Sequence, residues 1–375
     1  MPSGEFQVED ILKHLGVRGE PYKLESVGEA CGFQGTYYSL TIKNQSQRYF
    51  IKTIPTGTDI VTKFYRDLGT FPKEVLIYRD IFPRMEKFAV NKLWCCYFYG
   101  KEEGFLVLQD LTFSGWKLPR VMDLDHIKVA ITGLAEFHAA SLALIETDSN
   151  FVEMPLPETM FPASQGKPGR QMWEAYCRVA QYIVRLYMPE YDHVDVSAVL
   201  KNAVNDVGKS RKYRNCLNHG DPWMNNMFFE YVDGSPVKCC FVDFQSARFC
   251  PPALDVSIFL FIFDPLREAD LTQTYHKHLL EHLKRTKTAP LTKPEFDESL
   301  EVYKGPGIAI ASLYIFLTKL PHRFLSEILI SQETFIPFAL GHDYSPALNA
   351  LQEDVPYRQA VLDSLKRVVQ YYSSL

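Results

Sequence analysis

The sequence predicts an α+β fold of two lobes, with an antiparallel β-sheet and one key helix in the N-terminal lobe and a larger, mainly helical C-terminal lobe. Strand-forming runs separated by short turn-forming intervals fill residues 22–54, which is typical of antiparallel hairpins. Apolar residues at helical spacing dominate from residue 123 onward. Between these regions an apolar run at 105–108 leads into a loop rich in turn formers, as expected of a hinge. We therefore expect lobes at 1–110 and 111–375.

Composition narrows the class of protein. The 375 residues, 46% hydrophobic and 23% charged, can bury a sizeable core in two domains. A net charge of -5 without a basic stripe argues against nucleic acid or an anionic membrane surface as partner. The N-terminus lacks the pattern of a signal peptide, and the apolar run 256–263 is too short to cross a bilayer. Eight cysteines without zinc-site spacing favour free thiols, so we expect a cytoplasmic protein without a membrane partner.

The N-terminal lobe is expected to begin with a short helix and three antiparallel strands. The helix falls within residues 5–16, and the strands fall within 22–27, 36–42 and 47–54. The interval between the first two strands holds Gly28, Gly32 and Gly35, where backbone amides could approach phosphate groups. An ordinary hairpin turn explains these glycines nearly as well.

Two charged residues of this lobe have competing interpretations. Lys52 lies among apolar residues in the third strand, where an outward-facing lysine is the commoner situation. The functional alternative is a phosphate-contacting lysine that needs a carboxylate partner. Glu74, in the first turn of a helix predicted over 71–82, is one such carboxylate, although a surface glutamate near a helix N-terminus explains it equally well.

The segment 216–247 carries the strongest chemical pattern. Asp221 lies in a turn marked by a glycine and a proline, and Asn226 follows five residues later. A short apolar run then ends on Asp243. A loop carboxylate, an amide and a strand-end carboxylate can hold a divalent metal against a phosphate chain and leave one base for a hydroxyl group.

The order of these residues is more specific than any one of them. A strand lysine, a helix glutamate, a hinge, a loop aspartate with asparagine at plus five, and a strand-end aspartate recur in phosphotransferases of the protein-kinase-like fold. In that arrangement Lys52 meets the phosphates of ATP and Glu74 holds it, while Asn226 and Asp243 bind Mg²⁺. Asp221 accepts the proton of the attacking hydroxyl.

The chain resembles the ecdysteroid kinase-like (CHK kinase-like) family of the aminoglycoside and choline kinase superfamily. The resemblance is carried by residues 219–229 (HGDPWMNNMFF), 242–245 (VDFQ), 252–255 (PALD), 137–141 (FHAAS) and 106–111 (LVLQDL). The catalytic loop lacks the arginine of a His-Arg-Asp sequence, and Asp-Phe-Gln replaces Asp-Phe-Gly, which both point away from protein kinases. The resemblance implies ATP- and Mg²⁺-dependent phosphorylation of a small-molecule hydroxyl, with ecdysteroids the best-known substrates.

The resemblance also implies roles for four further residues. The backbone around Asp110 and Leu111 would bind adenine, His219 would brace the catalytic loop, and Asp255 would be a buried structural carboxylate. Gln109 stands where the family tends to have glutamate, and we expect little effect because the hinge works through backbone groups.

The acceptor is the open part of the prediction. Aromatic residues suited to an apolar, steroid-like or xenobiotic alcohol occur in the helical lobe, and core packing explains each of them as well: Trp173, Tyr176, Tyr182, Tyr187, Phe259, Phe261, Phe263, Tyr314 and Phe316. A choline or ethanolamine kinase is one alternative. A catalytically inactive nucleotide- or steroid-binding protein is another.

Other patterns receive structural interpretations. We expect His138 in the core, His276, His278 and His282 on a solvated helix face, and a chance match to a P-loop at 208–210. The helices expected in the C-terminal lobe cover 123–144, 171–188, 193–213, 256–263, 268–286, 295–318 and 346–373, the first with Asp123 as N-cap.

Overall fold

The structure is a computed structural model. It describes residues 7–27, 36–54, 59–102, 104–148, 151, 156–161, 166–205, 207–329 and 331–374, with Val61 and Gln332 described in their backbone alone. The chain forms two compact units. Unit 1 comprises Met1–Pro157, Pro222–Ala247 and Gln273–Pro290, and unit 2 comprises Glu158–Asp221, Arg248–Thr272 and Leu291–Leu375. The lobe boundary predicted at residue 110 stays a prediction.

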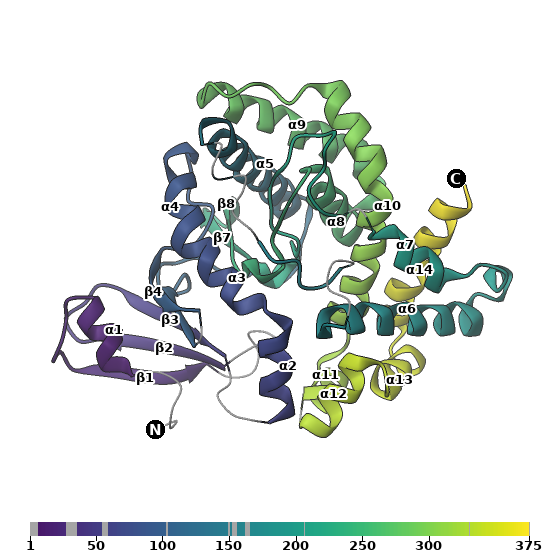
Figure 1. Ribbon diagram of the computed structural model, residues 1–375, viewed down its shortest axis with the longest axis horizontal. Helices are drawn as coiled ribbons and strands as arrows, with labels where there is room; N and C mark the ends of the chain where they lie inside the picture. Colours follow the sequence, from purple (N-terminus) through teal and green to yellow (C-terminus); the bar gives the residue numbers. More distant parts are fainter. Residues whose placement is uncertain are drawn as a thin grey trace. The chain divides into compact units, whose positions relative to one another are not determined.

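Unit 1 contains the predicted antiparallel sheet. Its strands are β1 (Tyr22–Val27), β2 (Thr36–Ile42), β3 (Arg48–Thr53), β4 (Tyr97–Lys101) and β5 (Phe105–Gln109). They follow the order β1-β2-β3-β5-β4, and every neighbouring pair is antiparallel (Figure 1). The α+β fold class is confirmed by this sheet and by the mostly helical remainder of the chain.

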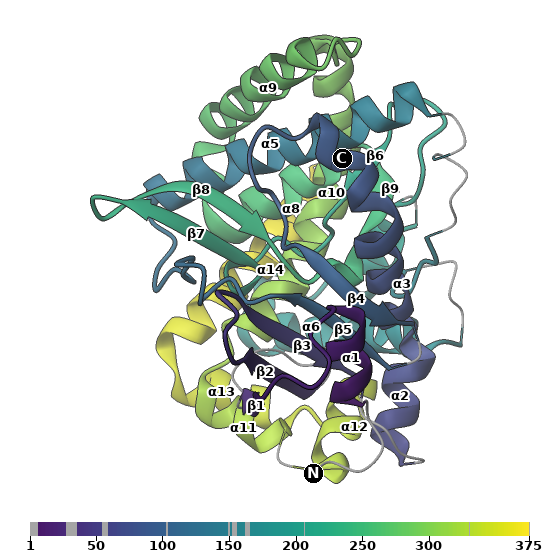
Figure 2. The same ribbon diagram turned by 90° about the vertical axis from the view of Figure 1, so that its left-hand side faces the viewer.

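The core of the sheet shows why these segments pair. Helix α1 (Val8–His14) lies against the sheet (Figure 2). It buries Ile11 and Leu12 in one cluster with alternate residues of the strands, among them Leu40 and Ile51, which have no exposed surface. Alternation along a strand places every second side chain on one face, so one apolar face packs under the helix.

A helical run follows β3. It consists of α2 (Ile60–Leu68), α3 (Thr70–Leu76), a π-helical turn η2 (Ile77–Ile81), α4 (Phe82–Met85) and η3 (Glu86–Phe88). The helix predicted over 71–82 is present, and α2 was not predicted. Pro83 explains the π-helical turn, because proline lacks an N–H and its ring would strike the carbonyl of residue 79 in a regular α-helix.

The rest of unit 1 packs a hairpin onto a long helix. Helix α5 (Leu124–Thr147) begins at Asp123, whose side chain accepts from the N–H groups of Asp125 and His126 as predicted. Strands β7 (Met227–Val232) and β8 (Ser235–Phe241) form the hairpin, and β8 lies along α5 (Figure 2). His138 is fully buried on α5 and pairs with the Tyr275 hydroxyl at 2.7 Å, which confirms the predicted core position.

Unit 2 is mainly helical. Its elements are α6 (Pro168–Tyr187), η6 (Pro189–Tyr191), α7 (Val196–Ala203), β6 (Cys216–Asn218), β9 (Arg248–Cys250), α8 (Ala253–Phe263), η9 (Pro265–Arg267), α10 (Lys293–Thr318), α11 (His322–Leu329), α12 (Gln332–Leu340), α13 (Ser345–Glu353) and α14 (Val355–Ser373). Helix α9 (Glu268–Arg285) starts in unit 2. The helix predicted over 193–213 ends at Ala203. The single helix predicted over 346–373 is two helices, because Asp354 caps α14 through the Tyr357 N–H.

Helices α8 and α10 form the centre of unit 2. A Cβ atom added to Gly307 of α10 would lie 2.3 Å from the Cβ of Ser257 on α8, so the two helices approach as closely as glycine permits. By length and composition, α5 and α10 are the two described helices that could cross a membrane. In each, 72% of the most apolar stretch is buried, which is the pattern of a core helix.

Candidate active site

Lys52 on β3 lies between two carboxylates of unit 1. Its Nζ atom is 2.7 Å from Glu74 Oε2 on α3 and 2.8 Å from Asp243 Oδ1, which follows β8. Lys52 is 5% exposed and Glu74 is 1% exposed. An outward-facing lysine and a surface glutamate are therefore both wrong, and the pair expected from the functional interpretation is present.

The electrostatics of this cluster favour a cationic lysine. Burial alone would lower the pKa of Lys52, but the carboxylates of Asp243 and Glu74 outweigh it and raise that pKa above its ordinary range. Burial raises the pKa of the Glu74 carboxyl, against the opposing effect of Lys52. With both carboxylates ionised, the cluster carries two negative charges against one positive charge, and a further cation would balance it.

The backbone at Asp243 is strained. Its φ of 64° and ψ of 68° place a non-glycine residue in the left-handed region, immediately before the 3-10 turn η8 (Phe244–Ser246). Such a conformation costs on the order of 1 kcal/mol and persists where the surrounding structure enforces it, commonly at functional sites. Here it turns the chain sharply at the end of β8, next to the cluster.

Asn226 and Asp243 fit the requirements of a magnesium site. The Val242 N–H donates to the Asn226 carbonyl at 3.0 Å, which joins the start of β7 to the residue before Asp243. Asn226 and Asp243 both line one pocket, and amide and carboxylate oxygens are ligands that Mg²⁺ accepts. The described residues contain no group of three or more His, Cys, Asp or Glu side chains placed for a metal.

The pocket in unit 1 has a volume of about 350 Å³. Its wall includes apolar side chains from the sheet and the hinge, together with the charged cluster: Val27, Tyr37, Phe50, Leu108, Leu111, Phe228, Lys52, Glu74, Asn226 and Asp243. This size and mixture are typical of small-ligand pockets. Gly28, Gly32 and Gly35 lie outside the described residues.

The hinge residue Asp110 is held by its side chain. Its carboxylate pairs with Arg48 at 2.6 Å and accepts from the Thr112 N–H at 3.0 Å. The side chain thus shapes the turn after β5, which leaves the backbone around Leu111 along the pocket. Sequence reasoning missed Arg48, because nothing local links a residue at the start of β3 to one 62 positions later.

In unit 2 the loop before Asp221 is anchored on a buried carboxylate. Asp255 has no exposed surface and accepts from the His219 N–H at 2.5 Å and the Gly220 N–H at 2.9 Å. The Tyr314 hydroxyl donates to the Gly220 carbonyl at 2.6 Å, and the Asp221 N–H donates to His219 Nδ1 at 3.2 Å. The structural roles expected of His219 and Asp255 are therefore present. Asp221 is 9% exposed, and its catalytic role stays a prediction.

The structure brings six of the predicted residues to one pocket of unit 1, namely Lys52, Glu74, Asp110, Leu111, Asn226 and Asp243. Asp221 belongs to unit 2. Sequence reasoning named Tyr314 only as a candidate for the acceptor or the core, and it missed that the Tyr314 hydroxyl holds a loop 94 residues earlier.

Comparison with known proteins gives a consistent family assignment. The sequence model of the ecdysteroid kinase-like family matches residues 36–288, more than half of the chain. No curated protein gives a significant match.

Several solved structures are similar at low identity. An ethanolamine kinase from Plasmodium vivax is 13% identical, with 91% of this chain and 83% of that chain covered and a TM-score of 0.43. A choline kinase from Cryptosporidium parvum Iowa II is 11% identical over 94% and 92%, with a TM-score of 0.45. A spectinomycin phosphotransferase in complex with ADP and spectinomycin is 10% identical over 93% and 98%, with a TM-score of 0.44.

Proposed function

Because the chain belongs to the ecdysteroid kinase-like family of small-molecule kinases, we propose that it transfers the γ-phosphoryl group of ATP to a hydroxyl of an apolar small molecule, such as an ecdysteroid or a xenobiotic. The observation that carries this proposal is the buried Lys52, held between Glu74 and Asp243 on the wall of a pocket large enough for a small ligand. A lysine fixed in this way presents one positive charge at a defined place, which phosphate recognition requires.

Each residue of the cluster has a proposed part. Lys52 would contact the α- and β-phosphates, and Glu74 would keep its ammonium group in place. Asn226 and Asp243 would hold Mg²⁺. Bound Mg²⁺ would neutralise charge on the phosphate oxygens. The backbone around Asp110 and Leu111 would bind the adenine ring.

Asp221 is the proposed base. It would orient the acceptor hydroxyl and accept its proton as the phosphoryl group is transferred. Its support is the anchored loop that carries it, because Asp255 and Tyr314 hold the two preceding residues by short hydrogen bonds. A fixed backbone limits the positions open to the Asp221 carboxylate, and such pre-organisation is what catalysis by positioning needs.

The apolar character of the acceptor rests on the family to which the chain belongs. Most aromatic side chains named above for this role are buried: Trp173, Tyr176, Phe259, Phe261, Tyr314 and Phe316. Trp173 packs edge-on against Phe161 and also contacts Tyr176, as core residues do. These side chains therefore add no separate support.

We also propose a cytoplasmic location. The cysteines in the described residues are free thiols, and most of them are buried, which suits a reducing compartment. Cell fractionation of the tagged full-length protein tests this, and recovery in a secretory or membrane fraction would contradict it.

The decisive experiment is a phosphotransfer screen with labelled ATP. Hydroxylated steroids, amino alcohols and plant phenols are offered to the wild type and to Asp221→Asn in the presence of magnesium. We expect transfer to at least one apolar polyol and a loss of about 10²-fold or more in Asp221→Asn, since that variant keeps the shape of the side chain but not its basicity. Circular dichroism of both proteins checks that the fold is unchanged.

Other outcomes contradict defined parts of the proposal. Transfer only to choline or ethanolamine would overturn the apolar acceptor while keeping the kinase chemistry. Binding of ATP without transfer to any compound would favour an inactive nucleotide-binding protein. Undiminished transfer by Asp221→Asn would remove Asp221 from the mechanism.

A further inference from the structure

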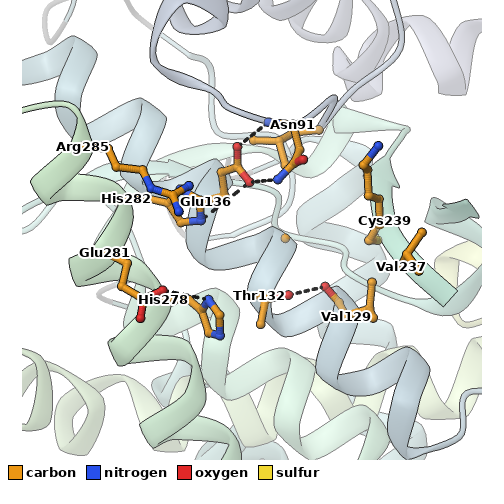
Figure 3. A pocket seen from close by; sticks show the side chains of 13 residues that line it. Asn91, Val129, Thr132, Glu136, Val237, Cys239, His278, Glu281, His282 and Arg285 are labelled. Carbon is orange, nitrogen blue, oxygen red and sulfur yellow. Dashed lines mark hydrogen bonds and ion pairs between the residues drawn. The ribbon is translucent and has the colours of Figure 1, made fainter.

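A buried carboxylate outside the proposed mechanism holds a loop of unit 1. Glu136 of α5 is 2% exposed. Its Oε1 atom accepts from the Val90 N–H at 2.5 Å and the Asn91 N–H at 2.6 Å. Its Oε2 accepts from Asn91 Nδ2 at 2.6 Å, and Figure 3 shows the contacts between Glu136 and Asn91. Burying an ionised carboxylate is costly unless it is hydrogen-bonded, and bonds to a charged acceptor are about twice as strong as neutral ones. The carboxylate is therefore committed to residues 90 and 91.

The held loop ends the helical run that carries Glu74. Residues 89–92 follow η3 directly, and the Ala89 N–H still donates to the Glu86 carbonyl. The run includes the π-helical turn η2, a local departure from α-helical geometry that commonly marks functional sites. Because the Glu136 carboxylate binds residues 90 and 91, it fixes the C-terminal end of this helical run on α5.

The same loop also contacts the hinge strand. The Lys92 ammonium donates to the Gln109 side chain at the end of β5, one residue before Asp110. Fixing the loop thus constrains two walls of the pocket that holds Lys52, the helical run and the end of β5. Only a small displacement of Glu74 is compatible with this pair, because the Lys52–Glu74 contact of 2.7 Å ceases to be a hydrogen bond beyond about 3.5 Å.

We propose that Glu136 is a positioning residue for phosphotransfer. By clamping Val90 and Asn91 it fixes the end of the helical run and so keeps Glu74 where it pairs with Lys52. The inference rests on the function proposed above for Lys52 and Glu74. Its mechanical part, the coupling of Glu136 to residues 70–88, is observable without any catalytic assay.

The pocket that Glu136 lines also offers a control residue. His282 of α9 has its Nε2 atom 3.6 Å from Glu136 Oε2, beyond a hydrogen bond, and lines a pocket of about 260 Å³ together with Glu136 and Glu281 (Figure 3). Glu281 is exposed and pairs with His278 at 3.5 Å, on the same helix α9. A Glu281→Gln substitution thus removes the same charge from the same pocket without touching the clamp.

The test compares three variants of the full chain, Glu136→Gln, the control Glu281→Gln, and the pair Glu136→Gln with Asn91→Asp. Glu136→Gln replaces one acceptor oxygen by an NH2 donor and removes the charge that strengthens all three hydrogen bonds. The added Asn91→Asp change supplies a carboxylate that can accept from the new amide. Amide hydrogen exchange of residues 70–88 and of α10, and the KM for ATP and kcat, are measured where circular dichroism shows all proteins folded.

We expect Glu136→Gln to speed exchange in residues 70–88 by about tenfold and to lower kcat/KM for ATP by about tenfold, with α10 and the acceptor KM unchanged. These factors correspond to the loss of about one charge-assisted hydrogen bond. The double variant should recover most of both effects, and Glu281→Gln should show neither.

Unchanged exchange over residues 70–88 in Glu136→Gln would overturn the clamp. Faster exchange throughout the chain, α10 included, would also overturn it, since that marks a general loss of stability. Additive losses in the double variant would contradict the pairing. A wild type that phosphorylates no acceptor would refute the proposed function instead, and the exchange comparison would still decide the clamp.

Discussion

Two groups of carboxylates have different partners in this protein, the fully buried Asp255 on one side and Glu74 with the partly exposed Asp243 on the other. Asp255 in unit 2 accepts from two backbone N–H groups, which are neutral donors fixed in the chain, and its charge also helps to raise the pKa of Arg248. Glu74 and Asp243 in unit 1 share a single lysine, and Asp243 is held in a strained backbone conformation. The first arrangement is a fixed support for a loop. The second places one lysine between two carboxylates, and the proposed function assigns that lysine to phosphate binding. The partners of an acid, more than its burial, thus distinguish the support of a loop from the cluster proposed to bind phosphate and Mg²⁺.

The largest expected effect on activity and stability is that of Lys52→Met. It removes the cation that pairs with both Glu74 and Asp243 and so leaves neither carboxylate with its lysine partner. We expect phosphotransfer to fall by about 10²-fold or more and the free energy of unfolding to fall by about 2–4 kcal/mol, since breaking one side of a buried ion pair strands the other. Kinetics and urea unfolding measure the two effects. Lys43→Met, at an exposed lysine, is the control, and normal transfer by Lys52→Met would refute the proposed role.

Asp255→Ala should lower the free energy of unfolding. It leaves the buried N–H groups of His219 and Gly220 without their acceptor, which costs about 1–3 kcal/mol for each group. Urea unfolding should show a loss of about 2–5 kcal/mol, and Asp255→Asn, which keeps one acceptor oxygen, should lose less. Equal losses in the two variants would mean that the packing of the side chain, rather than its oxygens, holds the loop.

Gly307→Ala tests the spacing between the helices that carry Asp255 and Tyr314. The added Cβ would meet Ser257 at 2.3 Å, so α8 and α10 must separate. Overpacking of this kind costs about 1–3 kcal/mol, which urea unfolding can measure. Adding Ser257→Gly removes the atom that is struck and should restore part of the loss. A Gly307→Ala variant as stable as the wild type would show that α8 and α10 can separate at little energetic cost.

The smallest effect concerns pH and His282. Burial lowers the pKa of His282 below its ordinary value of about 6.5. The positive charges of Arg285 and His278 lower this pKa further, whereas the carboxylates of Glu136 and Glu281 oppose the shift. Lys238 of β8 lines the same pocket.

A lowered histidine pKa means that the unfolded chain takes up the proton first, so the stability contribution is present above about pH 6.5 and is lost as the pH falls. Urea unfolding at pH 7.5 and pH 5.5 should show a smaller acid loss in His282→Gln than in the wild type. An identical pH dependence in both proteins would contradict this.

Much of the fold follows from local patterns in the chain. Alternating strands, the apolar stripe of α5 and the cap at Asp123 each depend on residues within a few positions of one another, and all are present. The prediction of a solvated face for three histidines was wrong for two of them, while the His278 side chain is 34% exposed. His276 and His282 are 6% and 8% exposed, because α9 packs part of its polar-looking face inward. A helical wheel of charged residues does not show which neighbour will cover it.

The candidate site divides in the same way. The order of Lys52, Glu74, Asp221, Asn226 and Asp243 along the chain indicated phosphotransferase chemistry, and motifs such as residues 219–229 indicated the family. That Asp243 pairs with a lysine 191 residues away, that Arg48 holds Asp110, and that Glu136 grips residues 90 and 91 was decided by the tertiary structure alone. The physical reason is range. Periodicity and capping act over a few residues, whereas an ion pair forms wherever packing brings two charges within about 4 Å, whatever their separation in sequence.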